Sequence, residues 1–168
     1  MRMNAHGRRL PRRPRPIAVN TLEIAAEGAA KMNQRDVNAL LAVVQDAFKS
    51  MREGVGTLQH WSILAGTLDV SMAIERQGVV RGLREHLLTA EAALQSIYNR
   101  AHSTRTWSPT ALYFHELDAV REFVNLHAFQ MRNLSRLEFE QVINTTTSQI
   151  RSSGGRATIV RELAGVAA

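Results

Sequence analysis

The sequence predicts an all-α protein, a mostly antiparallel bundle of five or six helices that follows a disordered basic arm. Apolar residues recur three and four positions apart over most of the chain, which is the spacing of one helix face. The period-two alternation of a half-buried strand does not occur, so no sheet is predicted. We assign residues 1–19 to the arm, 20–153 to the bundle and 154–168 to a C-terminal tail.

Length and composition narrow the class of protein. A chain of 168 residues is long enough for one domain with a sizeable core, and too short for two ordinary domains. The chain has no cysteine, which excludes a disulfide framework and a thiolate metal site. No apolar run approaches the about 18 residues of a membrane span, and the N-terminus lacks the apolar core of a secretory signal. We therefore expect a cytoplasmic protein without a membrane span.

The net charge of +6 belongs entirely to the N-terminal arm. Six of the 21 basic residues precede the first acidic residue, Glu23, and the remaining 15 face 15 acidic residues. Proline alternates with arginine in the arm and disfavours helix, so we expect an extended and solvated segment. The six basic residues of the arm are Arg2, Arg8, Arg9, Arg12, Arg13 and Arg15.

Two helices are predicted before residue 57. Asn20 and Glu23 form a capping pair in front of a short, small-residue face that ends near Met32. Asn33 caps the second helix, which Gly54 and Gly56 end. Its apolar face steps by four and three through Val37, Leu41, Val44, Phe48 and Met51.

The rest of the bundle packs against residues 57–101, interpreted as one helical hairpin or one kinked helix. One apolar stripe comprises Leu58, Trp61, Ala65, Leu68 and Met72, and the next comprises Val80, Leu83, Leu87, Ala90, Leu94 and Ile97. The second stripe is one residue out of phase with the first, which places the change of direction at residues 77–78. A second apolar flank, Ile63, Val70 and Ile74, indicates neighbours on two sides of the first half.

Two further helices follow a polar loop at residues 102–105. Ser108 and Pro109 predict the start of the fifth, whose stripe is Tyr113, Leu117, Val120, Val124, His127, Met131 and Leu134, with Phe123 alongside. Ser135 with Glu138 predicts a capping box for the last helix, which runs to residues 154–155. Threonines 145–147 predict fraying after Asn144. Residues 156–168 suit a short strand or a docked helical turn, and we leave the choice open.

The arm predicts contact with nucleic acid. Arginines in an extended segment lie along phosphates and release counterions, which gives salt-dependent and sequence-independent binding. Arg81 and Arg84 are three residues apart on one face and would extend this footprint. Alternatively, these two arginines form ion pairs with Glu75 and Glu85 on an ordinary charged helix face. The arm itself could instead be a solvated leader, or bind an acidic protein or an anionic membrane surface.

Part of the central stretch resembles the helix-turn-helix of bacterial repressors. The similarity lies within residues 64–76, at Ala65, Leu68, Val70 and Ser71. However, Asp69 stands where the family has its turn glycine, and the apolar Ile74 comes one position early, with Glu75 at the core position. One position turns a side chain by about 100° around a helix, so the packing would fail. The unbroken apolar stripe favours a continuous helix.

No catalytic or metal site is predicted. The start of the fifth predicted helix carries His115, Glu116, Asp118 and Glu122. His115 with Asp118, or Asp118 with Glu122, has a spacing that suits a metal ion, but no Glu-x-x-His or His-Glu-x-x-His motif completes the set. We expect His127, which lies in an apolar stripe, to be a core histidine bonded to an acceptor, with a pH-sensitive role as the alternative. No nucleophile motif or phosphate-binding glycine loop occurs, so neither an enzyme activity nor a cofactor is expected.

Two segments, residues 73–83 (AIERQGVVRGL) and 107–113 (WSPTALY), resemble small uncharacterised helical proteins of bacterial phage and mobile elements. The resemblance implies a bacterial accessory protein and brings no known activity. We therefore expect a non-enzymatic accessory protein, whose bundle associates with a protein partner or a second copy and whose arm contacts nucleic acid. The alternative is a purely protein–protein interaction module, such as a subunit or an inhibitor, with an incidental arm.

Overall fold

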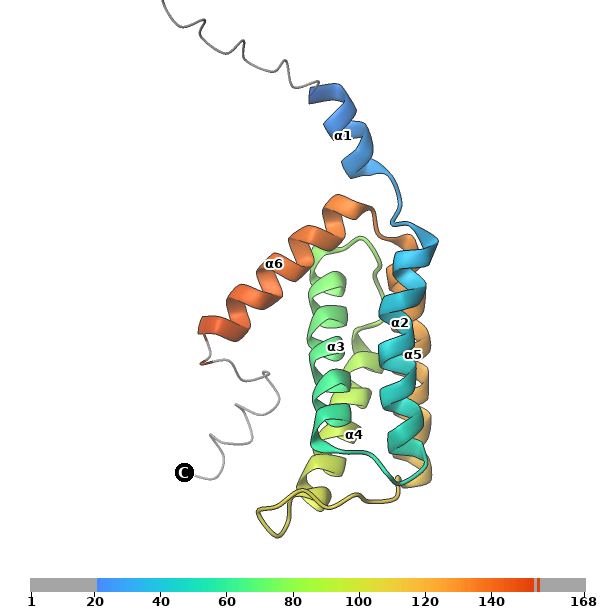
Figure 1. Cartoon of the computed structure of the whole chain (residues 1–168), viewed down its shortest axis with the longest axis vertical. Coiled ribbons are helices and arrows are strands. Elements are labelled where there is room, and N and C mark those ends of the chain that lie inside the picture. Colours follow the sequence, from blue (N-terminus) through green and yellow to red (C-terminus); the bar gives the residue numbers. More distant parts are fainter. Residues whose placement is uncertain (1–20, 153, 155–168) are drawn as a thin grey trace, which may run out of the picture.

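A computed structural model describes residues 21–152 and 154 (Figure 1). This part of the chain forms six helices and no strand, which confirms the all-α prediction. The arm, and the tail apart from Gly154, lie outside the described residues. The helices are α1 (Thr21–Ala29), α2 (Gln34–Arg52), α3 (Leu58–Gln77), α4 (Arg84–Ala101), α5 (Phe114–Asn133) and α6 (Arg136–Ser152).

The helices α2 to α5 form the body of the protein. Each runs antiparallel to the next, and both α2 and α4 pack against α3 and α5, so the four helices close into a bundle (Figure 1). Helix α6 crosses α3 obliquely and leaves the bundle, and α1 contacts α6 near its start. An isolated bridge between Lys31 and Ser135 joins the entries to α2 and α6.

Two apolar clusters hold these elements together. The larger lies among α2, α3, α4 and α5 and centres on the fully buried Trp61, Phe123 and Leu94. The smaller joins α6 to α2, α3 and α5 through Ile74, Leu134 and Val142. The predicted stripes supply most of both clusters, because residues three and four apart share one helix face.

The predicted helix starts at Asn33 and Ser135 are confirmed. The side chain of Asn33 accepts a hydrogen bond from the amide of Arg35 at 3.0 Å. The carboxylate of Glu138 accepts from the amide of Ser135 at 2.8 Å, while the Ser135 hydroxyl accepts from the amide of Glu138 at 3.3 Å, which completes a capping box.

The central stretch breaks fully at Gly78, so it is a helical hairpin. Gly78 ends α3 with a φ of 79°, a left-handed conformation that favours glycine. The next helix starts only at Arg84, so the predicted helical conformation of Val80 and Leu83 was wrong. The Glu75 carboxylate accepts from the amides of residues 82 and 83, at 3.0 and 3.4 Å, and thereby ties the turn before the following helix to α3. Both oxygens of the Glu75 carboxylate thus accept from backbone amides, and not from the guanidinium of Arg81.

The predicted start of α5 at Pro109 was wrong. Residues 107–113 run without helical structure, and α5 begins at Phe114. The indole nitrogen of Trp107 donates to the Gly56 carbonyl at 2.8 Å, and the Ser108 amide donates to the Ala101 carbonyl at 2.8 Å. These tertiary bonds hold the segment extended and override the local start signal. Tyr113, predicted in the apolar stripe, is exposed, and Glu116 is buried in its place.

Helix α6 continues through the three threonines to Ser152, so the predicted fraying after Asn144 was wrong. Thr146 is buried against the rest of the protein. Packing on α3 therefore outweighs the weak helix propensity of β-branched residues. None of the helices within the described ranges combines the length and the apolar character that a membrane crossing requires.

Candidate functional site

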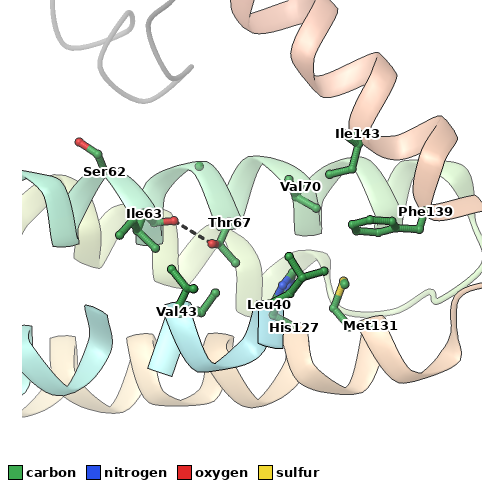
Figure 2. Close-up of a pocket in the computed structure, with 12 residues that line it drawn as sticks. Leu40, Val43, Ser62, Ile63, Thr67, Val70, His127, Met131, Phe139 and Ile143 are labelled. Carbon is green, nitrogen blue, oxygen red and sulfur yellow. Dashed lines mark hydrogen bonds between the residues drawn. The ribbon is translucent and has the colours of Figure 1, made fainter. Parts of the chain in front are cut away.

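An apolar groove opens on the face where α6 crosses the bundle. It has a volume of about 330 Å³, and side chains from α2, α3, α5 and α6 converge on it (Figure 2). Leu40 and Val43 on α2 remain 42% and 53% exposed, although both are aliphatic. The groove is lined by Leu40, Val43, Val44, Ser62, Ile63, Gly66, Thr67, Val70, His127, Met131, Phe139 and Ile143.

The α3 side of the groove is built on a helical face that includes Gly66. Ser62, Gly66 and Val70 are four residues apart, so they lie in one row along α3. A Cβ atom added at Gly66 would meet no neighbouring atom within 4 Å. Close packing therefore does not require glycine here, and its absent side chain deepens the groove. The Thr67 hydroxyl donates to the Ile63 carbonyl at 2.7 Å, which satisfies this hydroxyl within α3 (Figure 2).

The buried polar group of the groove is His127, which is 5% exposed. Its Nδ1 lies 2.8 Å from the Ser71 hydroxyl of α3, so the predicted bonded core histidine is confirmed. The Gln130 amide donates to the Ser71 carbonyl at 3.1 Å and ties α5 to the same residue. The groove therefore rests on a hydrogen-bonded junction between α3 and α5.

Burial lowers the pKa of His127 from its ordinary value of 6.5 to about 4. Between these values the unfolded chain holds the proton and the folded protein does not. The folded state therefore has its full stability above pH 6.5 and loses it as the pH falls toward 4. This places the histidine in its neutral form at physiological pH.

We expect the free energy of unfolding to fall by about 3 kcal/mol between pH 7 and pH 4 because of His127 alone. The measurement is denaturant unfolding across this range for the wild type and for His127→Gln, which has no proton to bind. The substitution should flatten the dependence of the free energy of unfolding on pH between pH 6.5 and 4.5. An unchanged slope in His127→Gln would contradict the buried neutral imidazole.

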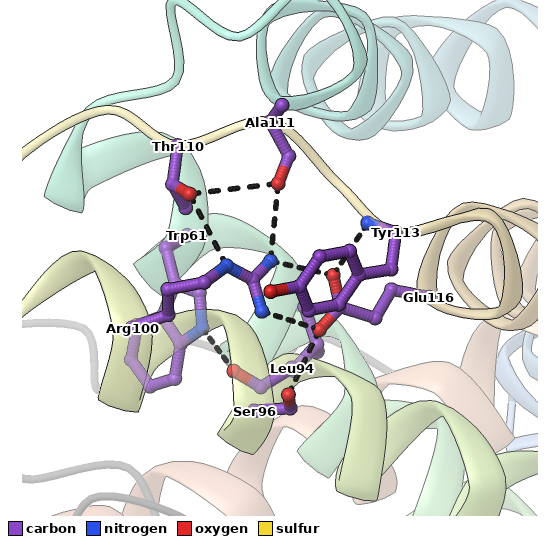
Figure 3. Close-up of polar contacts among 8 residues, drawn as sticks. All are labelled: Trp61, Leu94, Ser96, Arg100, Thr110, Ala111, Tyr113 and Glu116. Carbon is purple, nitrogen blue, oxygen red and sulfur yellow. Dashed lines mark hydrogen bonds and ion pairs between the residues drawn. The ribbon is translucent and has the colours of Figure 1, made fainter.

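A second polar cluster joins α4 to the segment before α5 (Figure 3). Glu116 is fully buried, and each of its carboxylate oxygens accepts two hydrogen bonds. Oε1 accepts from the Ser96 hydroxyl and from Arg100 Nη1, both at 2.8 Å. Oε2 accepts from Arg100 Nη2 at 2.6 Å and from the Tyr113 amide at 2.8 Å. Burial alone would raise the pKa of Glu116, but these hydrogen bonds, led by that of Arg100, lower it.

The polar groups of this cluster bond to one another and to the neighbouring backbone. Four accepted bonds use the acceptor capacity of the Glu116 carboxylate. The Arg100 guanidinium also donates to the Thr110 hydroxyl at 3.2 Å and the Ala111 carbonyl at 3.1 Å, and it lies 4.1 Å from the ring centroid of Tyr113 (Figure 3). The pair therefore clamps the extended segment 107–113 onto α4.

The predicted nucleic-acid-binding residues fall into two groups. Arg2, Arg8, Arg9, Arg12, Arg13 and Arg15 lie outside the described residues. Arg81 and Arg84 are both exposed, near the turn between α3 and α4. The Arg81 guanidinium donates to the Gly78 carbonyl at 2.9 Å, so it folds back over the turn. The turn between α3 and α4 lies at the same end of the bundle as the start of α2 (Figure 1).

The possible metal ligands on α5 have other contacts. Glu122 Oε1 lies 2.9 Å from His86 Nδ1, Asp118 pairs with Arg121 at 3.0 Å, and the His115 ring stacks on Tyr113. Within the described residues, no three His, Asp or Glu side chains come together in a way that would hold a metal ion.

The groove was not predicted from the sequence, although some of the apolar residues that form it were identified. Ile63 and Val70 form the predicted second flank of α3, and both line the groove. Leu40 and Val43 lie beside the assigned stripe of α2 and received no role. Two aliphatic residues outside a helix's core face are a sign of a second apolar surface.

Comparisons with protein-family models, with curated proteins and with solved structures found no match to this chain. The function of the chain is therefore inferred from its own residues. The resemblance of residues 73–83 and 107–113 to proteins of phage and mobile elements stays a prediction.

Proposed function

We propose that this chain is a non-enzymatic association module, whose bundle binds a protein partner in the groove between α2, α3, α5 and α6. The observation that carries the proposal is an apolar groove of about 330 Å³ with the aliphatic residues Leu40 and Val43 at its open edge. Exposed apolar surface of this kind is typical of binding sites. The occupant we propose is a short helix that inserts a few apolar side chains.

The size and chemistry of the groove favour side chains over a cofactor. Small-molecule sites usually have about 300–1,000 Å³ and several convergent polar groups, so this volume is at the lower limit. Its polar residues are Ser62, Thr67 and His127, and the last two already have hydrogen-bond partners in the protein. A groove with so little polar character suits aliphatic side chains.

Gly66 gives further support to a binding role. Glycine within a helix costs about 1 kcal/mol relative to alanine, and open space in front of Gly66 removes packing as the reason for its presence. We expect Gly66→Ala to raise the free energy of unfolding by about 0.5–1 kcal/mol, as measured by denaturant unfolding. A loss of stability in this variant would mean that the space at Gly66 is not open.

The groove is tested by filling it. Gly66→Leu places a side chain in the open space, whereas Gly66→Ala leaves most of the volume free, so the two variants form a matched pair. An extract of the cells that produce the protein is passed over the immobilised full chain, and the retained proteins are identified. The Gly66→Ala variant should retain the same proteins, and the Gly66→Leu variant should not. Direct binding of the purified partner then verifies the loss. Equal retention by both variants would overturn the proposal. A second copy of the chain is one possible partner, and sedimentation of the two variants identifies that case.

As a second proposal, the arm tethers this module to nucleic acid. The supporting observation is that the whole net charge of +6 is carried by residues 1–19, as described above. Arginine-rich segments bind phosphates without reading sequence. If the arm proves incidental, the chain remains a protein–protein interaction module, for example a subunit or an inhibitor.

Deleting residues 1–19 is expected to abolish salt-sensitive binding to mixed DNA and RNA fragments. Neutralising six phosphates gives an affinity that falls by about 10³-fold between 50 and 200 mM salt, and fluorescence anisotropy at these two concentrations measures it. The same measurement on the full chain with Arg81 and Arg84 changed to glutamine shows whether these bundle residues also contribute to binding nucleic acid. Binding that persists with the same salt dependence after deletion would contradict the tether.

A further inference from the structure

The floor of the groove holds a polar group with one unpaired atom. His127 is 5% exposed and lines the groove, and its Nδ1 lies 2.8 Å from the Ser71 hydroxyl (Figure 2). Its other ring nitrogen, Nε2, makes no hydrogen bond within the described residues. The enclosed side-chain atoms without a partner there are Gln130 Oε1 and Thr146 Oγ1, and Nε2 is not among them. Nε2 is therefore unpaired but accessible, and His127 meets open space where it lines the groove.

The Ser71 hydroxyl determines which ring nitrogen of His127 carries the proton. Because burial lowers the pKa of His127 to about 4, the ring is neutral at pH 7 and only one nitrogen is protonated. Ser71 is fully buried, and its hydroxyl has no other partner among the described residues. A proton on Nδ1 would leave the hydroxyl hydrogen buried without an acceptor, which is unfavourable. The hydroxyl therefore donates to Nδ1, and Nε2–H is a donor toward the groove.

An occupant of the groove has to satisfy this donor. A helix seated in the groove excludes solvent from Nε2, and a buried N–H without an acceptor is costly. Backbone carbonyls inside a helix already accept from amides four residues further on, so the acceptor must be a side chain. The described residues that line the groove include no lysine or arginine, so a carboxylate would be buried there without a counterion. The acceptor that fits is therefore neutral, a hydroxyl or a carboxamide.

We infer that the partner helix carries one serine, threonine, asparagine or glutamine among its aliphatic side chains, and that this residue accepts a hydrogen bond from His127 Nε2. The aliphatic side chains of the helix pack against Leu40, Val43 and Ile63. His127 thereby discriminates among apolar helices, because a helix without the acceptor leaves the donor unpaired. This inference rests on the proposed function, since it names the chemistry of the helix that the groove binds.

The protonated ring nitrogen is measured first, in the unmodified full chain. Long-range correlation spectra of ¹⁵N with ¹H distinguish a protonated ring nitrogen from an unprotonated one. The chain has six histidines, and the signals that disappear in His127→Gln are those of His127. We expect the proton on Nε2 at pH 7. A proton on Nδ1 would overturn the inference, because Nε2 would then need a donor and not an acceptor.

The chemistry of the occupant is tested with displayed helices of defined composition. The probe is a library of helices of about 14 residues, long enough for a stable helix. Four positions on one face, i, i+3, i+4 and i+7, vary among aliphatic residues, serine, threonine, asparagine and glutamine, and the other positions are fixed as alanine, glutamate and lysine. Helices are selected on the immobilised full chain, and those that Gly66→Leu also retains are discarded. We expect the remaining helices to share one polar residue among three aliphatic ones.

A selected helix is then compared with a version that has an apolar side chain of similar size at the polar position, such as valine for threonine. The wild-type chain should bind the apolar version at least about tenfold more weakly, because its Nε2–H is left unpaired. The double variant Ser71→Ala with His127→Phe lacks both the donor and the hydroxyl, so it should bind the two helices equally. Calorimetric titration measures the four affinities, and circular dichroism verifies the fold of the variant. Equal affinity of the wild type for both helices would overturn the inference, whether or not the variant folds.

The selection also separates this inference from the proposed function. Helices whose retention depends on Gly66, but whose varied positions are all aliphatic, would overturn the inference and leave the proposed function intact. If no helix is retained in a way that depends on Gly66, the proposed function falls, and the inference falls with it.

Discussion

Replacing Arg100 with methionine is expected to lower the free energy of unfolding at pH 7 by about 3–5 kcal/mol. Methionine removes all guanidinium bonds and leaves the Glu116 carboxylate buried with only Ser96 and the Tyr113 amide as donors. An uncompensated buried charge is among the most costly defects in a folded protein. The extended segment 107–113 also loses its clamp. Denaturant unfolding of the wild type and the variant measures the loss.

Two comparisons separate this effect from the loss of any surface charge. Arg121→Met breaks the exposed ion pair with Asp118 and should lower the free energy of unfolding by less than about 1 kcal/mol.

The second comparison is the dependence on pH. In Arg100→Met, the pKa of Glu116 is no longer held down, so acidification neutralises the buried charge. The deficit in the free energy of unfolding relative to the wild type should therefore shrink as the pH falls. In the wild type the lowered pKa stabilises the fold above the ordinary pKa, and this stabilisation disappears as the pH falls through the folded value. A deficit that is small or independent of pH would contradict the buried pair.

Trp61→Ala is expected to cost about 3–5 kcal/mol, the range for removing a large buried aromatic side chain. Trp61 is buried at the centre of the larger cluster, with its ring centroid 4.7 Å from that of Tyr98. Its indole nitrogen donates to the Leu94 carbonyl at 2.8 Å and so links α3 to α4 (Figure 3). The cavity cannot close, because helices on both sides fix its walls.

The matched control is Trp107→Ala, which removes the other tryptophan of the chain. Trp107 is only partly buried, at the loop before α5, and contributes one bond to the Gly56 carbonyl. Its loss should be at least about 1 kcal/mol smaller, since less apolar surface leaves water. Thermal unfolding followed by circular dichroism compares the two variants, and equal losses would show that Trp61 is not the centre of the core.

The helices could be predicted where the local signals agree with the packing. Asn33, Gly78 and Ser135 each satisfy backbone groups at a helix end, and such bonds are local in sequence. Prediction failed at Pro109 and at Thr146, where contacts with residues far along the chain decide the conformation. The bond from Trp107 to Gly56 spans 51 residues, and no local pattern contains it.

The candidate site could be predicted only in part for the same reason. The second apolar flank of α3 indicates two neighbours, but the crossing of α6 determines that one of these faces stays open as a groove. The burial of His127 follows from its stripe, whereas its partner Ser71 lies 56 residues away and was not identified. The burial of Glu116 was not predicted because it depends on Arg100, which lies in the last turn of a different helix, α4.

The most direct test of the groove as an association site is photo-cross-linking from Val43 of the full chain within the cells that produce it. A photoreactive phenylalanine derivative at position 43 should give an adduct that contains a second protein, while the same group at Leu88, on α4, should not. An intramolecular cross-link leaves the mass of the chain almost unchanged, so it is distinguished from an adduct with a partner. Protein adducts of equal yield at positions 43 and 88, or none at 43, would contradict the groove as the site of association.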